Sequence, residues 1–596
     1  MKKLINQNDF IVNETLGLFV HEDGPAIDYA DSSEDFLADL FLGINHISSY
    51  PVEMQQHISD WPTRYHLSHM RTNLMESVKE LFRPDSKVLE LGAGMGALTL
   101  WFCDNFRHVD AVEGSLRRAQ ALRTRAKDRK NLRVFVGNIS DIEFTEKYDL
   151  ITLVGVLEYL PFYSEGDPRT VCMDFFKGLV SCLNKDGILL ISIENKLGAK
   201  YFSGCHEDHT GKLFDGIMDY PRKSPVTFSR NEMKEMLHES GITQVQFYHL
   251  FPDYKLPKLV FKEREDDDYS MVRGWIKGYF EDLSRERLFF FHDTLFIETL
   301  IKSKLLHHFS NSFLIVSSVS DNTNLDTEFL IKKFWNPEDT KSMFHHTITL
   351  LRRNTEYLVE RNPLNDGTLE TKVDKTSFKL SECEKYVEGA PLMTEVYKSL
   401  FMNDNFSSLA NIICEIKDGL LKNFSKGTKD DFGYEVVHGQ SIDYCFWNLL
   451  RSEDGHFVFI DTKWAYDGLL TADDVLYRNL NGLYYDIYYH VKQIPFSEFT
   501  ISLLSRIYEN YDFKRFYKNI KVDLDFSNTI ALAPKSVEDY LSRDTIDNIM
   551  VRPDEIVQLQ TELSNFRLIQ QGRIWKLLRK YYRLRDRIMK AVRRDS

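Results

Sequence analysis

Short apolar runs alternate with helical stretches between residues 86 and 193 of the chain. The runs are rich in Val, Leu and Ile, and polar or glycine-containing turns separate them. Strands that alternate with helices in this way are typical of parallel βαβ units. The pattern therefore predicts an α/β domain, with strands at residues 87–91, 108–112, 132–136, 149–154 and 188–193.

The pattern changes at a run of seven charged residues, 262–268. Such runs are usually solvated helix ends or linkers, so we place the first domain boundary here. Further along we expect strands at 313–318 and 328–334, a long helix at 339–361 and a helical tail from Pro553 onward. The predicted units are an α/β domain with an N-terminal helical cap at 1–262, an α+β domain at 263–540 and a helical basic tail at 541–596.

Composition narrows the class of protein. A chain of 596 residues is too long for one hydrophobic core, and 43% hydrophobic with 28% charged residues is typical of a folded globular protein. The net charge of −14 argues against general nucleic-acid binding, which needs Lys and Arg to neutralise phosphates. Seven scattered cysteines without a Cys-x-x-Cys pair argue against a disulfide framework or a structural zinc. No apolar run approaches the ~18 residues of a membrane span and no secretory signal is evident, so we expect a cytoplasmic location.

A glycine-rich turn follows the first predicted strand. Glu90 lies near the end of that strand, and Gly92, Gly94 and Gly96 follow it in the turn. In a parallel α/β sheet, ligands bind at the carboxyl ends of the strands, and glycines let a cofactor approach the backbone. A glycine triplet alone does not separate a methyl-donor site from a dinucleotide site or a plain turn. The Gly-x-Gly-x-Gly spacing, however, disfavours a nicotinamide enzyme.

Residues at the next two strand ends make the prediction more specific. Glu113 ends the second strand, where its carboxylate can accept hydrogen bonds from both hydroxyls of a ribose. Asn138 follows the third strand and can offer its amide to an adenine edge while Ile139 packs on the ring. With Glu90 and the glycines, this ordered set resembles the class I S-adenosylmethionine-dependent methyltransferases. The resemblance implies a Rossmann-like fold with S-adenosylmethionine as cofactor.

Acceptor residues are expected before and after this core. Tyr65 and His66, in a segment that precedes it, can cap the cofactor from a helix or can be packing residues. The segment His206-Glu-Asp-His209 follows the fifth strand, and we interpret it as part of a polar acceptor lid, with either histidine as a base or an anion contact. A metal site is the less favoured alternative, because the histidines lie in a loop and no distant third ligand is evident.

A second set of polar residues lies far downstream. Asp443 and Asn448 have the Asp-x-x-x-x-Asn spacing of a kinase catalytic loop, where the carboxylate orients the acceptor hydroxyl and the amide oxygen binds magnesium. Asp461 closes a short strand at the second metal-binding position. The pattern predicts a protein-kinase-like domain that binds ATP with Mg²⁺ and uses Asp443 as its catalytic carboxylate.

The phosphate-binding residues of this domain are sought upstream. Lys332 fits the strand lysine that holds the phosphates, and Glu356, on the expected helix, fits its carboxylate partner. Adjacent strand residues face opposite sides, so Lys333 is the alternative to Lys332, which we prefer. No phosphate-covering glycine loop precedes the strand, and a kinase-like fold without activity is the other interpretation.

Together the two halves resemble the bacterial methyltransferase–kinase proteins of surface-polysaccharide synthesis. The resemblance covers most of residues 50–470 and includes the strings Glu194-Asn-Lys-Leu-Gly198, Glu207-Asp-His-Thr-Gly211 and Pro252-Asp-Tyr-Lys-Leu-Pro257. It implies a bifunctional enzyme that phosphorylates and then methylates the end of a glycan, such as the O-antigen of lipopolysaccharide. The chain departs from the family at Lys463, where a Glu is usual.

The last residues carry a basic amphipathic pattern. Residues 573–596 contain ten Lys and Arg against two Asp, and apolar residues recur there at spacings of three and four. A helix of this kind can lie on an anionic inner leaflet, where each basic residue contributes about 1 kcal/mol. We therefore expect a peripheral location on the inner face of the cell membrane, close to a lipid-linked polysaccharide acceptor. Packing of the helix on a partner glycosyltransferase is the alternative.

Two other functions stay open at this level. One is a monofunctional sugar O-methyltransferase whose pseudokinase domain is a scaffold, and the other is a non-enzymatic platform that regulates glycan length by binding. The sequence also leaves open whether a hydroxyl or a phosphate accepts the methyl group.

Overall fold

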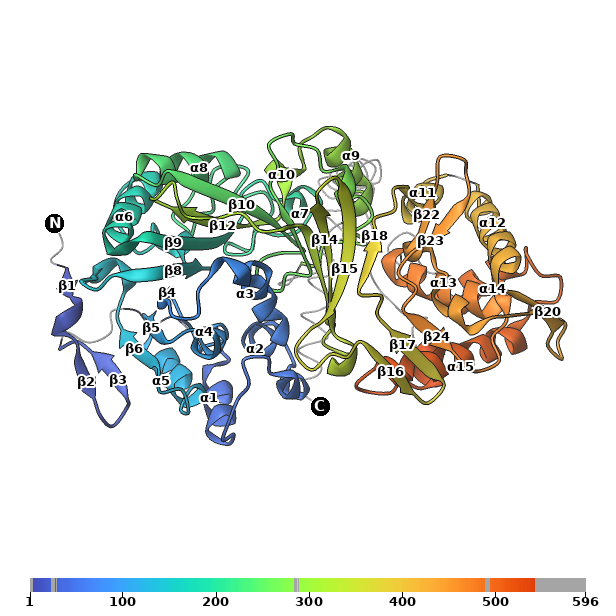
Figure 1. Cartoon of the computed structure of the whole chain (residues 1–596), viewed down its shortest axis with the longest axis horizontal. Coiled ribbons are helices and arrows are strands. Elements are labelled where there is room, and N and C mark those ends of the chain that lie inside the picture. The colour runs from blue at the N-terminus through green and yellow to red at the C-terminus, as the bar shows by residue number, and fades with distance from the viewer. Residues whose placement is uncertain are drawn as a thin grey trace, which may run out of the picture.

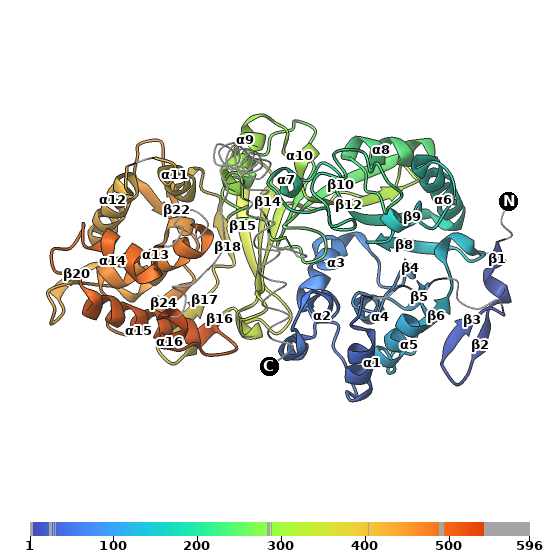
Figure 2. The same cartoon turned by 180° about the vertical axis from the view of Figure 1, so that it is seen from behind.

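A single fourteen-stranded sheet runs through both halves of the molecule (Figure 1). The computed structural model describes residues 4–22, 27, 29, 31–282, 287, 289–402, 404–487 and 494–541. The strand order across the sheet is β18-β15-β14-β13-β11-β10-β12-β9-β8-β4-β5-β6-β3-β2, in which β3 (Leu18–Val20) and β2 (Ile11–Asn13) form the N-terminal edge. Figure 1 shows the α/β unit at one end, the yellow strands in the middle and the orange helical unit at the other end, and the reverse view in Figure 2 shows the same order.

The predicted parallel strands of the α/β domain are confirmed. They are β4 (Lys87–Leu91), β5 (His108–Glu113), β6 (Leu132–Val136), β8 (Tyr148–Val154) and β9 (Leu183–Glu194). All are paired in parallel, and their side chains are almost entirely buried. A strand that is covered by helices on both faces of the sheet has a continuous apolar sequence, so these strands could be predicted from the sequence.

Helices cover the two faces of this part of the sheet. One face packs on α1 (Glu34–Leu42), α3 (Asn73–Val78), α4 (Thr99–Asn105) and α5 (Leu116–Arg125). The other face packs on α6 (Pro168–Cys182) and α8 (Arg230–Glu239). The arrangement is a three-layer α/β sandwich with a separate apolar core on each face.

The domain boundary predicted at residue 262 is wrong. Strand β12 (Ser312–Ser318) follows the charged run, yet it lies between β9 and β10 (Gln244–Phe251) and is antiparallel to both. Strand β11 (Leu259–Lys262) then pairs with β13 (Phe329–Trp335), the first strand of the next unit. The charged run begins at the end of β11, where Lys262 pairs with Asp326 and Glu263 pairs with Arg230, and it continues into a partly exposed turn. It does not mark the end of a core.

The helix predicted at 339–361 is also wrong. This segment forms the hairpin of β14 (His346–Arg353) and β15 (Glu356–Pro363), with Asn354 at the turn in a left-handed conformation of φ 55°. Strand β18 (Cys383–Lys385) completes this edge of the sheet. The run Thr-Ile-Thr-Leu-Leu is almost entirely buried, and its β-branched residues suit a pleated surface better than a helix.

The second unit is mainly helical beyond the sheet. Its core lies among α11 (Leu392–Ser399), α12 (Ser407–Phe424), α13 (Ala472–Ile487), α14 (Phe496–Leu504) and α15 (Phe513–Ile530). A small sheet of β19 (Ala390–Pro391), β22 (Leu449–Arg451) and β23 (Phe457–Phe459) lies beside them.

Within the described part of the chain, no helix has the length and apolar character needed to cross a membrane. The predicted basic amphipathic helix lies outside the described residues.

Candidate methyl-donor site and second polar site

The glycine-rich turn after β4 has the backbone that only glycine adopts easily. Gly92, Gly94 and Gly96 have φ values of 79°, 57° and 83°. A Cβ atom on Gly92 would lie 2.2 Å from Cγ2 of Val156, in the loop after β8. The turn therefore lets two loops meet closely at the carboxyl ends of the parallel strands.

A cavity of about 380 Å³ opens at this edge of the sheet. A volume of this size is in the range of small-molecule sites in proteins. Most of the predicted cofactor residues line it, namely Glu90, Gly92, Gly94, Glu113, Asn138 and Ile139. Gly96 does not, since it packs against Leu122 and shapes the turn from outside the cavity.

Glu113 is fixed by the backbone of the turn. One carboxylate oxygen accepts the Gly94 amide at 2.8 Å, and the other accepts the Ser115 amide at 2.9 Å. Each carboxylate oxygen has a second lone pair, so the group can still accept hydrogen bonds from a ribose.

Glu90 and Asn138 differ in how they are held. Thr99 donates to Glu90 at 2.6 Å, and burial raises the pKa of Glu90 to about 8. Its carboxyl group is therefore mostly protonated at neutral pH and can donate a hydrogen bond. Asn138 accepts the Ser140 amide through Oδ1 at 3.1 Å, so its amide NH₂ is the donating end of the side chain.

The cap predicted before the core lies over the cavity. Helix α2 (Trp61–Leu67) contributes Tyr65 and His66 to the lining. Nε2 of His66 is 2.8 Å from Oδ2 of Asp31, and Arg118 donates to the same oxygen at 3.2 Å. Burial lowers the pKa of His66 to about 4, so the ring is neutral. Asp31 and Arg118 also line the cavity, and neither was predicted.

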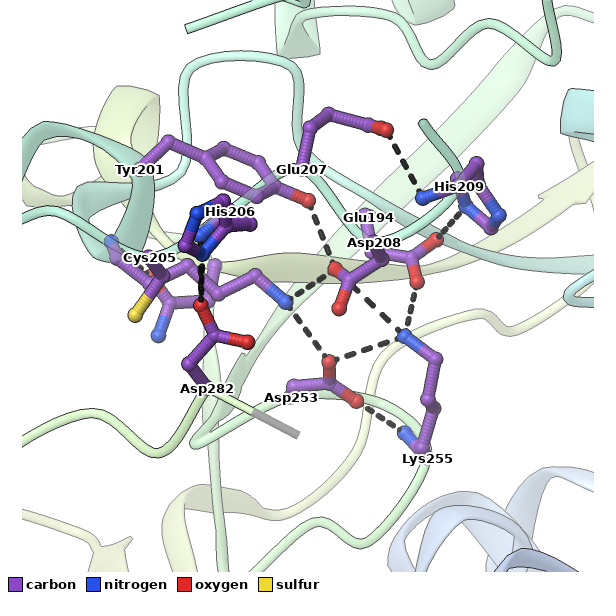
Figure 3. A network of polar contacts seen from close by, with 12 residues as sticks. Glu194, Tyr201, Cys205, His206, Glu207, Asp208, His209, Asp253, Lys255 and Asp282 are labelled. Carbon is purple, nitrogen blue, oxygen red and sulfur yellow. Dashed lines mark hydrogen bonds and ion pairs between the residues drawn. The ribbon is translucent and has the colours of Figure 1, made fainter. Parts of the chain in front are cut away.

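A network of buried charges lies at the acceptor end of the cavity (Figure 3). Lys255 bridges Glu194 and Asp253, and Lys200 donates to Asp208 at 2.5 Å and to Asp253 at 3.0 Å. These residues come from the end of β9, from α7 (Ala199–Phe202) and from two later loops, so sequence distance hides the network. Lys255 and Asp208 line the cavity, whereas Lys200 and Asp253 lie behind it.

Only one of the two predicted histidines reaches the cavity. His209 lines it, with Nε2 3.2 Å from Oε2 of Glu194 and 3.8 Å from Oε1 of Glu158. Burial opposes the charged ring, but the carboxylates of Glu194 and Glu158 raise the pKa of His209 to about 10. His206 does not line the cavity, and its Nδ1 lies 2.8 Å from Asp282. The structure therefore does not place His206 at the site.

Glu158 is a cavity residue that the sequence analysis missed. It lies in the segment after β8, and no sequence motif distinguishes a single Glu at this position. Its side chain is fully buried, and burial raises its pKa to about 7.

The predicted residues of the second polar site also come together. Nδ2 of Asn448 donates to Oδ2 of Asp443 at 2.7 Å, and both side chains are buried. Asp461 has a left-handed backbone, with φ 60°, and its two carboxylate oxygens pair with Lys463 and with Arg361, the latter at 3.2 Å. Burial opposes ionisation of Asp461, but these two cations lower its pKa well below its usual range.

The preferred phosphate-binding pair, Lys332 and Glu356, is wrong. Lys332 points to the α/β unit, where Nζ lies 3.4 Å from the Ser77 carbonyl. Glu356 begins β15, is exposed and pairs with Lys385 at 2.7 Å. No helix is present there to bring the carboxylate to the lysine.

Lys333, the alternative, faces the second polar site. Burial lowers its pKa, and the charges of Asp461 and Lys463 act on it. A further lysine, Lys277, was not predicted. It donates to the Trp447 carbonyl at 2.6 Å, and burial, aided by the charge of Lys333, lowers its pKa to about 7.

Comparison with known proteins supports the first of these sites. A family model described as a methyltransferase domain matches residues 66–246. An uncharacterized methyltransferase of Staphylococcus carnosus (strain TM300) is 28% identical over 171 residues, which is 28% of this chain and 77% of the relative.

Two solved methyltransferase structures also resemble the chain. One is a S-adenosylmethionine-dependent methyltransferase of Thermotoga maritima, described as a possible histamine N-methyltransferase, with 13% identity and a TM-score of 0.25 over 42% of this chain and 91% of the other. The second is N-methyltransferase NodS of Bradyrhizobium japonicum WM9 with S-adenosylhomocysteine, with 18% identity and a TM-score of 0.20 over 28% and 75%. The family match and the α/β fold together show that this chain contains a class I, Rossmann-like S-adenosylmethionine-dependent methyltransferase domain.

Proposed function

We propose that the protein methylates the end of a bacterial surface glycan, and that the methyl acceptor is a phosphate oxygen that its kinase-like unit installs. The observation that carries the proposal is the shared cavity. The cofactor residues around Glu113 and the charged residues Lys255 and His209 line the same space of about 380 Å³. Donor and acceptor chemistry are therefore within reach of each other.

Two cationic side chains at the acceptor end of the cavity, Lys255 and His209, can donate hydrogen bonds to an anionic acceptor. S-adenosylmethionine, when bound, supplies its methyl carbon to the acceptor oxygen by in-line displacement. With a pKa of about 10, His209 is an imidazolium at neutral pH and is unable to take a proton from a sugar hydroxyl. Together with the Lys255 ammonium group it can bind and orient a phosphate, whose oxygen needs no base to attack.

The residues at the other end of the cavity bind the cofactor. The glycine turn and Glu113 hold the adenosyl portion, and the neutral Glu90 carboxyl group adds no second negative charge beside it. Positioning supplies most of the rate, because the two reacting groups are held at a fixed separation.

For the kinase-like unit we propose phosphoryl transfer from ATP to the terminal sugar hydroxyl. Asp443 would accept the hydroxyl proton as the oxygen attacks the γ-phosphorus and ADP leaves, and Lys333 and Lys277 would hold the phosphates. The carboxylate of Asp461 and the amide oxygen of Asn448 are ligands that Mg²⁺ accepts. Lys463 must move before Asp461 can bind Mg²⁺, since both carboxylate oxygens are paired.

A second candidate function rests on that pairing. Lys463 places an ammonium group on the carboxylate that would hold the metal, as expected of a pseudokinase scaffold beside a monofunctional sugar O-methyltransferase. Peripheral binding to the inner membrane and recognition of a lipid-linked polysaccharide belong to the proposal and rest on the sequence of residues 541–596 and on the family resemblance.

The test is incubation of purified full-length protein with a lipid-linked or free glycan, methyl-labelled S-adenosylmethionine and magnesium-ATP, with and without ATP. We expect labelled glycan only when ATP is present, and none with Asp443→Asn. Methylation that persists without ATP, or in Asp443→Asn, would favour the scaffold function. Absence of labelled product under both conditions, with tight binding of S-adenosylhomocysteine, would reject the glycan as substrate.

A further inference from the structure

Three side chains from separate segments converge beside the methyl-donor cavity. Glu158 follows β8, Glu194 ends β9, and His209 lies in the loop after α7 (Ala199–Phe202). One ligand atom from each lies within 4.8 Å of the other two. Glu158 and His209 face the cavity, so a ligand held by the three groups would meet it.

The spacing of the three groups suits a metal ion. Nε2 of His209 is 3.2 Å from Oε2 of Glu194 and 3.8 Å from Oε1 of Glu158. In a tetrahedral zinc site with bonds of about 2.1 Å, neighbouring ligand atoms lie about 3.4 Å apart. The observed separations bracket that value, so only small side-chain movements would be needed.

An independent observation comes from the hydrogen bonding of Glu158. Its side chain is 0% exposed, and among the described residues neither of its oxygens has a hydrogen-bond partner. Buried carboxylates nearly always have donors, as Glu113 does here with two backbone amides. Its ion pair with Nε2 of His209, at 3.8 Å, is longer than a hydrogen bond. Glu158 therefore has room for one more positively charged partner.

The surrounding contacts would support such a site. Nδ1 of His209 lies 3.2 Å from the hydroxyl of Tyr159, which can fix the tautomer that presents Nε2 to a metal. Lys255 holds the other oxygen of Glu194 and leaves Oε2 directed at the histidine. A second group of carboxylates, Glu194, Asp208 and Asp253, is as close together but is already neutralised by Lys200 and Lys255.

We propose that Glu158, Glu194 and His209 bind one divalent metal ion of the zinc or manganese class, with an open coordination position toward the methyl-donor cavity. Three protein ligands and an open position are the usual arrangement of a metal that contacts substrate. His209 would bind the ion as a neutral imidazole and would release the proton that it carries without the ion, so the ion takes over the positive charge that the imidazolium otherwise offers to the acceptor. Two carboxylates and the neutral imidazole then balance the charge of the ion. The role of the ion rests on the proposed function, in which a phosphate oxygen of the acceptor would take the open position.

The step then needs no additional reagent. A second oxygen of the same phosphate attacks the methyl carbon, the O–CH₃ bond forms as the S–CH₃ bond breaks, and S-adenosylhomocysteine leaves. The ion would hold the acceptor and offset its negative charge beside Glu158 and Glu194.

The test is a calorimetric titration of full-length, chelator-treated protein with Zn²⁺ and, separately, with Mn²⁺. We expect one ion per chain with micromolar or tighter affinity, and a loss of about tenfold to a hundredfold in Glu158→Gln and in His209→Gln. His206→Gln is the matched control, because this histidine lies three residues away and does not line the cavity; its affinity should equal that of wild type.

Binding of S-adenosylhomocysteine by each variant verifies that the domain is folded. Wild-type protein that binds neither ion more tightly than 100 µM would overturn the proposal. So would Glu158→Gln or His209→Gln with unchanged affinity, or His206→Gln with an equal loss. Because ion binding is measured without acceptor, a metal site can be confirmed even if no glycan is methylated, and methylation can persist when no ion binds.

Discussion

The two polar sites of this chain differ in how many partners their buried carboxylates have. At the methyl-donor cavity, Glu158 is buried with no hydrogen-bond partner among the described residues, and Glu90 has one hydroxyl donor. At the second site, Asp461 has a cation on each oxygen. A carboxylate without partners is costly unless a ligand supplies them, whereas a fully paired one is stable alone. The first site is thus built to be completed by a ligand, and the second is complete without one.

The largest effect is expected at the glycine turn. In Gly92→Ala the new Cβ would lie 2.2 Å from Val156, and the φ of 79° adds backbone strain. Strain and clash together should weaken S-adenosylhomocysteine binding about a hundredfold in a calorimetric titration.

Gly241→Ala is the matched control for that change. Gly241 has a φ of 89°, but nothing lies within 4 Å of its added Cβ, so it tests backbone strain alone. Equal affinity of wild type and Gly92→Ala would show that the turn does not shape the cofactor site.

The next effect is a difference in pH dependence. Burial raises the pKa of Glu90 to about 8 in the folded state, above the value of about 4.3 in an unfolded chain. Between these values the folded state keeps a proton that the unfolded state has lost, so the free energy of unfolding falls as pH rises. Glu90→Gln avoids this loss and should gain about 2 kcal/mol relative to wild type between pH 6 and pH 8, measured by denaturant titration.

Glu509→Gln serves as the control for loss of one exposed charge. A constant stability difference between Glu90→Gln and wild type across this pH range would contradict the raised pKa. The opposite pH trend is expected for Asp461, whose lowered pKa means that its stabilising pairs are lost as pH falls through the acid range.

A smaller effect separates two adjacent lysines. Because Lys333 faces Asp461 and Lys332 contacts the α/β unit, Lys333→Met should weaken nucleotide binding about tenfold. Lys332→Met, its matched control, should leave that affinity unchanged. Equal losses in both variants, measured with a fluorescent ATP analogue, would remove Lys333 from the phosphate site.

The smallest effect concerns the metal at the second site. Removal of the ammonium group in Lys463→Met frees one oxygen of Asp461, so Mg²⁺ should raise ATP affinity several-fold more in this variant than in wild type. Lys375→Met, on an exposed lysine that pairs with Asp525, is the control. If Mg²⁺ acts equally on both proteins, Lys463 does not compete with the metal.

Local pattern predicted what is local in this structure. The glycine turn and five strands, β4, β5, β6, β8 and β9, were predicted because Gly spacing depends on backbone conformation and apolar runs depend on burial. The sequence did not settle which of Lys332 and Lys333 points to the second polar site. The two adjacent residues are both lysines and face opposite sides of the strand, so the sequence is the same for either orientation.

Long-range placement was not predictable in the same way. Strand β12 follows the charged run in the sequence but lies between β9 and β10 in the sheet. Its own sequence does not indicate which strands it pairs with. Glu158 and Lys255 are single residues that matter because the fold brings them beside His209 and Glu194. The hairpin β14–β15 was mistaken for a helix because leucines and arginines, which favour helices, follow its β-branched residues.

The position of β12 has a consequence for biosynthesis. The ribosome must synthesise the chain to residue 318 before β12 can pair with β9 and β10. Until then, β9 and β10 have unpaired edges while about 50 residues after β11 are made. A chain shortened to residue 262 would keep every cofactor residue and still lack the strand that joins its sheet. Such a fragment is expected to aggregate, and nascent chains of this length are natural clients of a chaperone.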